Sequence, residues 1–355
     1  MLISFFKSSS MSRNSSPAKL LIIYTGGTIG MAFDNSGSLV PMGFREIKYH
    51  IPEIAKLGYE FDMHAFTPPI DSSNMSPEIW VALCGIIERN YNSYDGFVIL
   101  HGSDTMAFTA SALSYMLQNL DKPVILTGSQ LPIGEIRTDA KENIITTMEI
   151  AGAKKEGRSI VPEVCIYFDY FLFRGNRSKK YNTEKFEAFH SPNYPSLAEA
   201  GIDILYKEAY ITSHPQQSFH VNTKLDTNIA VLKMFPGITQ SAVEPILNIP
   251  GLKAVIMETF GNGNTITAPW FIQLLEKKIK AGIIIVDRTQ CDGGSVELGR
   301  YETSTYLKEI GVTGGSDMTF EATVTKLMWL LGQDLPTAEV KELLETSLKG
   351  ELTEK

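Results

Sequence analysis

A hydroxyl residue and two glycines follow the first apolar run of the chain. Residues 20–23 are Leu-Leu-Ile-Ile, and a run without polar alternation predicts a strand buried on both faces of a parallel sheet. Thr25, Gly26 and Gly27 follow, and glycine permits a sharp turn and a close approach of a ligand to the backbone. At the carboxyl end of such a strand Thr25 could be a nucleophile, or an unreactive residue of an ordinary turn. The spacing matches neither the dinucleotide-binding glycine motif nor a P-loop.

Hydroxyl side chains also follow the second predicted strand, residues 61–66. Asp71, Ser72 and Ser73 stand between this strand and a helix predicted over residues 77–90. Hydroxyls and backbone N–H groups at the start of a helix suit a carboxylate ligand. Asp and Ser are equally common in plain turns, so both interpretations stay open.

A third junction follows residues 96–100, which form the clearest strand of the sequence. Ser103 and Asp104 come next, before a predicted helix. Asp104 occupies a position where a helix N-cap belongs, and capping alone would explain it. It could equally hold the ammonium group of a ligand. His101, beside the strand end, is typical of a hydrogen-bonded structural histidine.

Two further predicted strands, residues 123–126 and 164–168, also end in polar residues. Ser129 follows the first, and the segment 174–180, with four basic residues in seven, follows the second. Such a basic segment is usually a solvated turn. On a sheet of this kind, one of its lysines could instead point back at Ser103.

The elements that would position these residues indicate an α/β protein of two domains. Residues 18–205 are predicted to form a larger N-terminal domain, with a mainly parallel or mixed sheet flanked by helices. Residues 206–226 are polar and irregular, and we interpret them as a linker. Residues 227–355 begin a new strand–helix series, which predicts a smaller, parallel α/β domain of the flavodoxin-like type. The Ser-rich residues 1–17 are interpreted as a disordered leader.

The composition argues against several classes of function. The chain has 32 basic and 40 acidic residues and a formal net charge of −8, which argues against a nucleic-acid partner. No apolar run is long enough to cross a bilayer, so we expect no membrane partner. Cys84, Cys165 and Cys291 are far apart and odd in number. They indicate neither a disulfide framework nor a zinc site, and they favour a reducing compartment.

Together, the junctions resemble one family, the bacterial-type L-asparaginases, and within it the cytoplasmic type I branch. The family has two signature stretches, a T-G-G-T-I turn and an H-G-T-D-T-M segment, matched here by residues 25–29 and 101–106. The resemblance covers nearly everything after the leader. Supporting matches lie at residues 71–73, 127–130, 174–177, 263–264, 289–291 and 350–353.

The resemblance implies hydrolysis of the side-chain amide of L-asparagine to L-aspartate and ammonia in the cytoplasm, without metal or cofactor. It implies that Thr25 is the nucleophile and that Ser103, Asp104 and Lys180 form a second hydroxyl–carboxylate–lysine group. The implied substrate-binding residues are Asp71, Ser72, Ser73, Asp104, Ser129 and Asn264.

Within this set, Ser72 resembles the residue that binds the substrate α-carboxylate, and Asp104 the one that holds the α-ammonium. Asn264 resembles a residue that reaches the site from a neighbouring subunit. The family forms dimers, usually paired into tetramers, so we expect a homodimer or homotetramer with active sites at the subunit boundary.

Amide hydrolysis is consistent with these residue types. It needs an activated nucleophile, a proton for the departing ammonia and donors for the developing oxyanion. A lysine among apolar strand ends can serve as the base. The glycine-rich turns offer backbone N–H groups as oxyanion donors.

Three features depart from the family pattern. Ser103 replaces the usual threonine, which keeps the hydroxyl and loses the methyl that restricts χ1. Residues 37–41 lack the tyrosine that many relatives carry in a lid, so Tyr24 or a rearranged lid would have to activate the nucleophile. Lys179 and Glu258 differ from the residues expected of a cooperatively controlled enzyme, so we do not expect that control in the same form.

Two alternative functions fit the same residues. The first is a glutaminase or a dual asparaginase and glutaminase, because one methylene separates the two substrates. The second is an inactive sensor that binds an amino acid, against which the presence of Thr25, Asp104 and Lys180 argues. The asparaginase-like subunit of a tRNA amidotransferase would carry an extra N-terminal domain, which residues 1–17 are too short to form.

Overall fold

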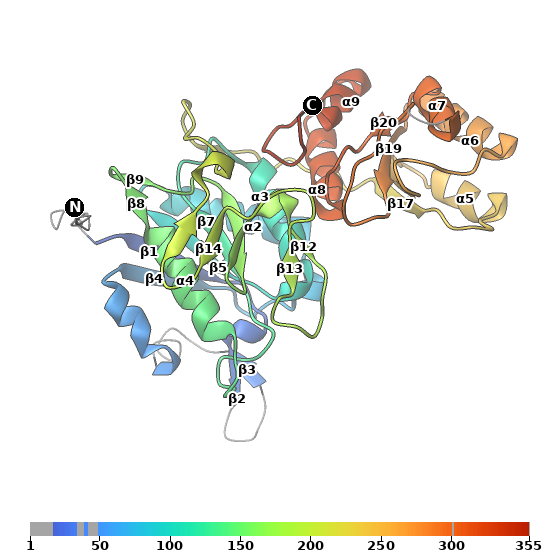
Figure 1. Ribbon diagram of the computed structural model, residues 1–355. Helices are drawn as coiled ribbons and strands as arrows, with labels where there is room; N and C mark the ends of the chain where they lie inside the picture. The colour runs from blue at the N-terminus through green and yellow to red at the C-terminus, as the bar shows by residue number, and fades with distance from the viewer. Residues whose placement is uncertain (1–16, 34–38, 42–48, 300–301, 355) are drawn as a thin grey trace, which may run out of the picture.

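The computed structural model describes residues 17–33, 39–41, 49–299 and 302–354. They form a larger and a smaller α/β domain, each with its own sheet (Figure 1). The predicted two-domain α/β fold is confirmed. Of the predicted leader only Pro17 lies within the described residues.

The larger domain is built on an eight-stranded sheet with the order β15-β14-β11-β10-β7-β5-β1-β4. The strands from β10 to β4 run parallel, and β11, β14 and β15 pair antiparallel. The sheet is therefore mixed. Its strands are β1 (Lys19–Tyr24), β4 (Glu60–Ala65), β5 (Gly96–Leu100), β7 (Val124–Thr127), β10 (Val164–Phe168), β11 (Phe171–Arg174), β14 (Ala198–Ala200) and β15 (Ile204–Tyr206).

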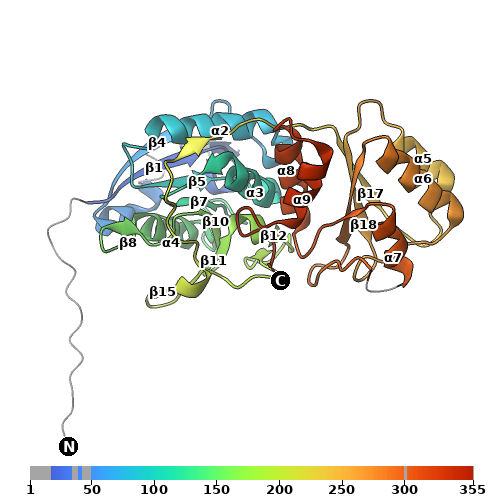
Figure 2. The ribbon, with the colours of Figure 1, turned by 90° about the horizontal axis from the view of Figure 1, so that it is seen from above.

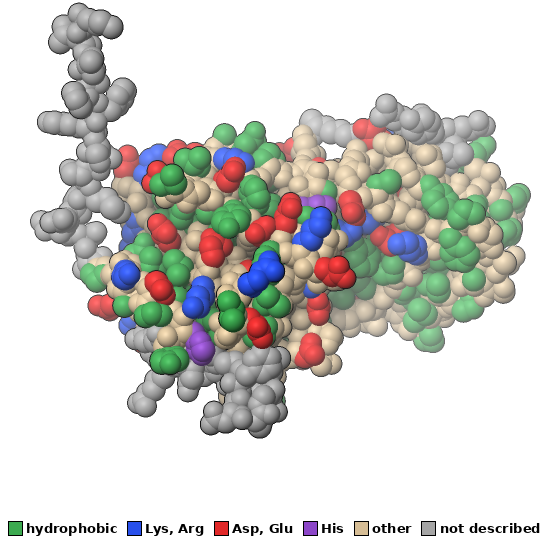
Figure 3. All heavy atoms as spheres, turned by 60° about the horizontal axis from the view of Figure 1, so that its bottom comes forward, with side chains coloured by type: hydrophobic (Ala, Val, Ile, Leu, Met, Phe, Trp, Pro, Cys, Tyr) green, Lys and Arg blue, Asp and Glu red, His purple; other side chains and the backbone are tan. Residues whose placement is uncertain are grey.

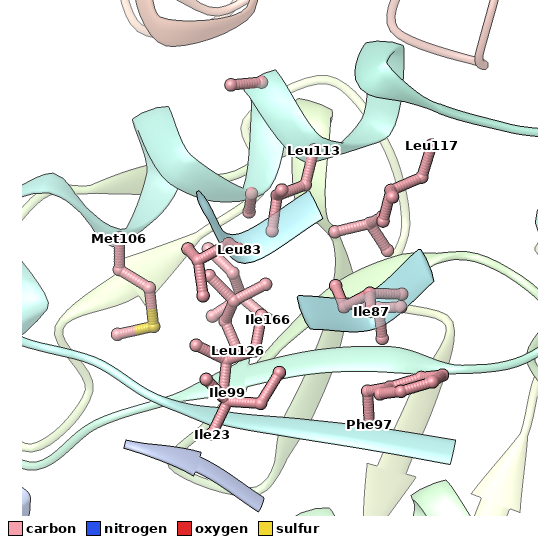
Figure 4. Close-up of a cluster of buried hydrophobic side chains, with 14 of the residues drawn as sticks. Ile23, Leu83, Ile87, Phe97, Ile99, Met106, Leu113, Leu117, Leu126 and Ile166 are labelled. Atoms are coloured by element: carbon pink, nitrogen blue, oxygen red, sulfur yellow. The ribbon is translucent and has the colours of Figure 1, made fainter. Parts of the chain in front are cut away.

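Helices cover both faces of this sheet because its central strands are apolar on both sides. Strands β5, β7 and β10 are buried throughout, and β1 from its second residue onward. α2 (Pro77–Asn90) and α3 (Met106–Met116) pack on one face, and α4 (Ala140–Gly152) on the other (Figure 2). Figure 4 shows the first of these layers, where strand side chains meet those of the two helices: Ile23, Ile99, Leu126, Ile166, Leu83, Ile87 and Leu113.

The smaller domain contains a four-stranded parallel sheet in the order β17-β18-β19-β20. Its strands are β17 (Ile229–Lys233), β18 (Ala254–Thr259), β19 (Ile284–Thr289) and β20 (Thr313–Gly314). On one face lie α5 (Gln240–Leu247), α6 (Pro269–Lys280) and α7 (Glu302–Glu309), and on the other α8 (Phe320–Leu331) and α9 (Thr337–Glu345). The predicted parallel α/β domain is confirmed.

Short ladders and 3-10 turns make up the remaining regular structure of the described chain. The ladders pair β2 (Met31–Phe33) with β3 (Leu39–Pro41), β6 (Leu117–Gln118) with β16 (His220–Val221), β8 (Lys154–Lys155) with β9 (Arg158–Ser159), and β12 (Lys179–Lys180) with β13 (Phe189–His190). The 3-10 turns span Thr28–Gly30, Pro52–Leu57, Ser72–Asn74, Ser103–Thr105, Gly175–Arg177 and Glu208–Tyr210. Because β16 pairs with β6, the segment interpreted as a linker is attached to the larger domain.

The two domains are joined by packing and by buried charges. α3 of the larger domain packs against α8 of the smaller one. Arg177 donates to the Gly350 carbonyl at 2.7 Å and to Asp317 at 2.9 Å. Lys326 and Glu351 form an ion pair of 2.6 Å in which both side chains are fully buried. Leaving one charge of such a pair alone in the interior would cost about 3–5 kcal/mol, so the pair holds the C-terminal segment in place.

Candidate active site

A cleft of about 490 Å³ opens at the carboxyl ends of β1, β5 and β7, which is the edge where α/β sheets bind ligands. Residues from four separate junctions line it. The predicted residues among them are Asp71, Ser72, Ser103, Asp104, Ser129 and Lys180. Four further lining residues were not among the predicted site residues. Three of them, Thr28, Gln130 and Thr183, are polar, and the fourth, Met31, is apolar.

Thr25, the predicted nucleophile, lies outside this cleft. Its side chain is 1% exposed, and its hydroxyl donates to the carbonyl of Leu100 at 3.0 Å. Its backbone N–H bonds to the same carbonyl, and its own carbonyl accepts from Ile70. The Thr25 hydroxyl is thus held at the sheet edge in this arrangement, and its role as the nucleophile stays a prediction. Thr28, three residues later, is half-buried and lines the cleft.

Gly26 and Gly27 carry the chain from Thr25 to Thr28. Their φ angles are +143° and +85°, values that residues with a side chain rarely adopt. A Cβ on Gly27 would lie 2.5 Å from the backbone of Gly102, which belongs to the junction after β5. The junctions after β1 and β5 thus touch, and only glycine lets them come this close.

Lys180 reaches the second hydroxyl from the β12–β13 hairpin. Its Nζ lies 2.8 Å from Ser103 Oγ and 2.7 Å from Asp104 Oδ1. The Lys180 side chain is 14% exposed, whereas that of Asp104 is 65% exposed. The structure therefore brings the hydroxyl–carboxylate–lysine group together and leaves the carboxylate open to a ligand. Asp104 does not cap α3, which begins at Met106 with Thr105 in the N-cap position.

Ser72 faces the same cleft from the loop after β4. It is 5% exposed, and a Cβ on Gly102 would lie 2.6 Å from its hydroxyl oxygen. Its carbonyl accepts from the Thr105 hydroxyl at 2.7 Å. Asp71 accepts from the N–H and the hydroxyl of Ser73 at 2.9 and 2.8 Å, and these bonds lower the pKa of Asp71. Ser73 does not line the cleft. It bonds to Asp71, which does, so Ser73 is placed to orient the Asp71 carboxylate.

Ser129 and Gln130 bound the cleft beside β7. Ser129 is 4% exposed, and its hydroxyl donates to the Leu131 carbonyl at 2.6 Å. The backbone N–H of Gln130 donates to Asp139 at 2.9 Å, and its side-chain amide donates to the Lys185 carbonyl at 2.9 Å. Gln130 therefore joins two loops that are remote in sequence.

His101 supports the floor of the cleft from below. It is fully buried, with Nδ1 2.6 Å from the Gly102 carbonyl and Nε2 2.9 Å from Thr109 Oγ1. Burial lowers the pKa of His101 to about 4, so the ring is neutral at pH 7. These contacts agree with its interpretation as a structural histidine. The Tyr24 hydroxyl donates to the Gly27 carbonyl at 3.4 Å, which places it under the glycine turn.

Asn264 lies in the smaller domain and does not line the cleft of its own chain. Its backbone N–H and carbonyl both bond to Phe260 after β18, which fixes a tight loop. Its contact with substrate from a neighbouring subunit stays a prediction. Of residues 37–41, which match the lid of relatives, residues 37 and 38 lie outside the described residues.

Lys179 and Glu258, which differ from the residues expected of a cooperatively controlled enzyme, both form ion pairs. Lys179 pairs with Asp292, and Glu258 accepts from Arg288 at 2.7 Å. Lys179 therefore points away from Ser103, while its neighbour Lys180 points toward it. This agrees with the expectation that one lysine of the basic segment turns back to the sheet edge.

Within the described residues, no group of three or more His, Cys, Asp or Glu side chains could hold a metal ion. None of the described helices is both long and apolar enough to span a membrane.

A two-domain α/β fold, with hydroxyls, a carboxylate and a lysine at one sheet edge, defines a hydrolase of the amidohydrolase class. The chain belongs to the asparaginase family: residues 19–212 match the model "Asparaginase, N-terminal" and residues 228–344 match "Glutaminase/Asparaginase C-terminal domain".

Three similar proteins illustrate this membership. L-asparaginase 1 of Escherichia coli (strain K12) is 41% identical over 340 residues, which cover 94% of this chain and 98% of the relative. The crystal structure of L-asparaginase I from Vibrio cholerae superposes with a TM-score of 0.86 at 40% identity, covering 95% of this chain and 99% of that one. A 60 kDa lysophospholipase of Mus musculus is 39% identical over 94% of this chain, which spans 62% of that longer protein.

Proposed function

We propose that the protein is an L-asparaginase that hydrolyses L-asparagine to L-aspartate and ammonia. The observation that carries the proposal is the cleft in which Thr28 shares the sheet edge with Ser103, Asp104 and Lys180. These groups supply the nucleophile, the proton path and the charges that hydrolysis of an amino-acid amide requires. The names of the two asparaginase relatives point to the same substrate.

Of the two threonines of the glycine turn, Thr28 lines the cleft and is the proposed nucleophile, and Thr25 is the alternative. The Thr28 Oγ attacks the amide carbon, while backbone N–H groups of the glycine turn stabilise the developing oxyanion. Ser103 and Lys180 are 2.8 Å apart and form a path along which a proton reaches the departing nitrogen. The proton that the threonine loses on attack follows this path and ammonia leaves. Water then attacks the acyl carbon, the bond to the threonine Oγ breaks, and the threonine regains a proton.

Ser72 and Asp104 are the proposed recognition groups for the α-carboxylate and the α-ammonium. Ser72 is buried against Gly102, so its hydroxyl is fixed in position at one end of the cleft. The exposed Asp104 carboxylate lies 2.7 Å from Lys180 Nζ and can form a charge-assisted bond to an ammonium group.

We further propose a homodimer or homotetramer in which Asn264 of one subunit completes the cleft of another. The position of Asn264 outside its own cleft supports this proposal. The three cysteines are free, with Cys84 and Cys165 buried and Cys291 exposed. Free thiols support a reducing compartment, and we propose the cytoplasm.

The nucleophile is tested by removing each threonine hydroxyl in turn. Thr28→Ala should lower kcat by about 10³-fold or more with little change in KM, because the hydroxyl acts in the chemical step. Thr25→Val is the matched control: it loses one buried hydrogen bond, worth about 1 kcal/mol of stability, and should keep kcat within about tenfold. Ammonia release from L-asparagine and L-glutamine measures both variants and the wild type.

Each alternative gives a distinct result in this assay. An inactive, folded Thr25→Val together with an active Thr28→Ala would return the nucleophile to Thr25. Faster ammonia release from glutamine would identify a glutaminase. Binding of aspartate without ammonia release from either amide would identify a sensor.

A further inference from the structure

The loop that carries Asn264 rests on a buried carboxyl group. This loop, residues 260–264, follows β18 and is closed by two hydrogen bonds of 2.8 Å between the backbones of Phe260 and Asn264. Asp287 lies on the neighbouring strand β19, and its side chain is fully buried. The acidic side chains visible in Figure 3 lie at the surface instead, where water solvates their charge.

Asp287 also differs from other buried acids of this protein. Among the described residues no ion pair is formed by Asp287, whereas a cation faces each of three others, in the pairs Glu163–Arg174, Asp317–Arg177 and Glu351–Lys326. Those three pairs bring distant segments of the chain together. The contacts of Asp287 are confined to its own end of the sheet, so its role is to be sought there.

The two oxygens of Asp287 face the two ends of the Asn264 loop. Oδ1 accepts from the hydroxyl of Thr259 at 2.6 Å, and Thr259 is the last residue of β18, directly before the loop. Oδ2 faces Gly263, directly before Asn264, because a Cβ on Gly263 would lie 2.8 Å from it. One carboxyl group thus fixes both where the loop begins and where Asn264 follows.

Gly263 is packed tightly at this point. Its φ angle is +103°, and a Cβ there would also lie 2.9 Å from Val296 Cγ1. The loop is therefore held between the Asp287 carboxyl and the Val296 side chain. Removing the carboxyl would leave a hole beneath Gly263 and would take the hydrogen bond away from Thr259.

We propose that Asp287 is a positioning residue, which holds the Asn264 loop where the Asn264 side chain contacts substrate in the cleft of a neighbouring subunit. This rests on the proposed asparaginase function and on the proposed role of Asn264. Asp287 itself touches neither the substrate nor the reacting atoms and acts through the loop. Its removal should therefore weaken substrate binding and leave the chemical step, which groups of the larger domain perform, unchanged.

The first test compares two substitutions of Asp287 at pH 6. Asp287→Ala should raise KM for L-asparagine by about three- to tenfold, the effect of one lost hydrogen bond to substrate, and leave kcat within about twofold. Asp287→Asn keeps an acceptor for Thr259 and fills the space beneath Gly263, so its KM should stay within about twofold of the wild type. Burial raises the pKa of Asp287 to about 7, so at pH 6 the carboxyl is mostly neutral, as the amide is.

Two further variants separate positioning from lost stability. Leu344→Ala removes a side chain buried on the face of this sheet opposite Phe260, and it should leave KM unchanged. Asn264→Ala should raise KM, and adding Asp287→Ala to it should raise KM by less than about twofold more, because the positioned side chain is already gone. Independent roles would multiply the two effects.

The outcomes distinguish this proposal from those on which it rests. An unchanged KM in folded Asp287→Ala, or effects that multiply with Asn264→Ala, overturns the positioning role alone. An unchanged KM in Asn264→Ala overturns the role of Asn264 and the positioning role with it. If the wild type releases no ammonia from asparagine, the asparaginase proposal itself fails.

Gly263→Ala gives the same test from the side of the loop, should Asp287→Ala not fold. The new Cβ would displace Gly263 from Asp287 and Val296, and KM should rise as in Asp287→Ala. An unchanged KM in Gly263→Ala would overturn the positioning role.

Discussion

Ser103 is positioned for chemistry by its neighbour Lys180. A serine samples its χ1 rotamers more freely than a threonine, because it lacks the methyl group on Cβ. The 2.8 Å contact with Lys180 Nζ favours the rotamer that points at the lysine. The hydrogen bond thus replaces part of the restriction that a methyl group would provide.

Removing the Ser103 hydroxyl should therefore interrupt the proton path. We expect Ser103→Ala to lower kcat by about 10²-fold or more, and Ser103→Thr to keep activity within a few-fold, since it retains donor and acceptor. Ser241→Ala is the matched control, because the exposed Ser241 hydroxyl bonds to Thr239 in the smaller domain and does not line the cleft. The measurement is ammonia release at saturating asparagine. Near wild-type turnover in Ser103→Ala would show that the second hydroxyl is dispensable.

At the scale of elements, the site exists because two strand-to-helix junctions come into backbone contact. Gly27 after β1 and Gly102 after β5 leave no room between them for a side chain. Neighbouring parallel strands bring their carboxyl ends to the same edge, and the absence of side chains lets the two loops close the remaining gap. Thr28 owes its position in the cleft to this contact.

Gly27→Ala should displace the Thr28 turn and abolish most of the activity, since the new methyl would lie 2.5 Å from the Gly102 backbone. Gly58→Ala is the control for conformational strain alone. Gly58 also has a positive φ, +70°, but a Cβ there meets nothing within 4 Å. Its cost should stay near 1 kcal/mol of stability with kcat unchanged. Thermal unfolding and ammonia release measure both, and an active Gly27→Ala would contradict the close contact.

Strand β19 carries a buried acidic residue, Asp287. Its side chain is fully buried, Oδ1 accepts from Thr259 at 2.6 Å, and Oδ2 has no hydrogen-bond partner among the described residues. Burial raises the pKa of Asp287 to about 7. The folded state therefore binds this proton more tightly than the unfolded state does.

A raised carboxyl pKa lowers the free energy of unfolding as pH rises from about 4 to about 7, with no further loss above the folded pKa. Asp287→Asn cannot ionise, so its stability relative to the wild type should rise across that window by up to about 4 kcal/mol. Urea unfolding of both proteins at pH 4, 6 and 8 measures the difference. A difference independent of pH would show that folding does not raise the pKa of Asp287.

At the scale of the whole molecule, Asn264 of the smaller domain does not line the cleft of its own chain. The larger domain contributes every described residue that lines it. The proposed contribution of Asn264 therefore makes activity depend on association of subunits. A monomer would keep the chemical groups and lose one contact to substrate.

We expect the active form to be at least a dimer, and Asn264→Ala to raise KM for asparagine more than it lowers kcat. Sedimentation velocity combined with assays at decreasing protein concentration should show activity falling as the protein dissociates. Asn262→Ala, in the same loop, is the matched control and should leave KM unchanged. A fully active monomer would remove Asn264 from the site.

Sequence periodicity determined the fold class, and the resemblance to the asparaginases supplied the residues of the candidate site. Strands such as β5 and β10 are apolar on both faces, and that pattern exists only where a sheet is covered on both sides. Strand ends then predicted where Ser72, Ser103 and Ser129 would lie. These properties are local, because they depend on the residue types within a few positions along one chain segment.

The tertiary structure decided which of these side chains meet. Local pattern could not show which of the two threonines lines the cleft. The Thr25 hydroxyl bonds instead to the Leu100 carbonyl on a neighbouring strand. Local pattern also could not find Gln130, whose partner Lys185 is 55 residues away, nor choose Lys180 over Lys179. Such contacts arise when segments far apart in the chain pack together, and the residue types within any one segment do not specify them.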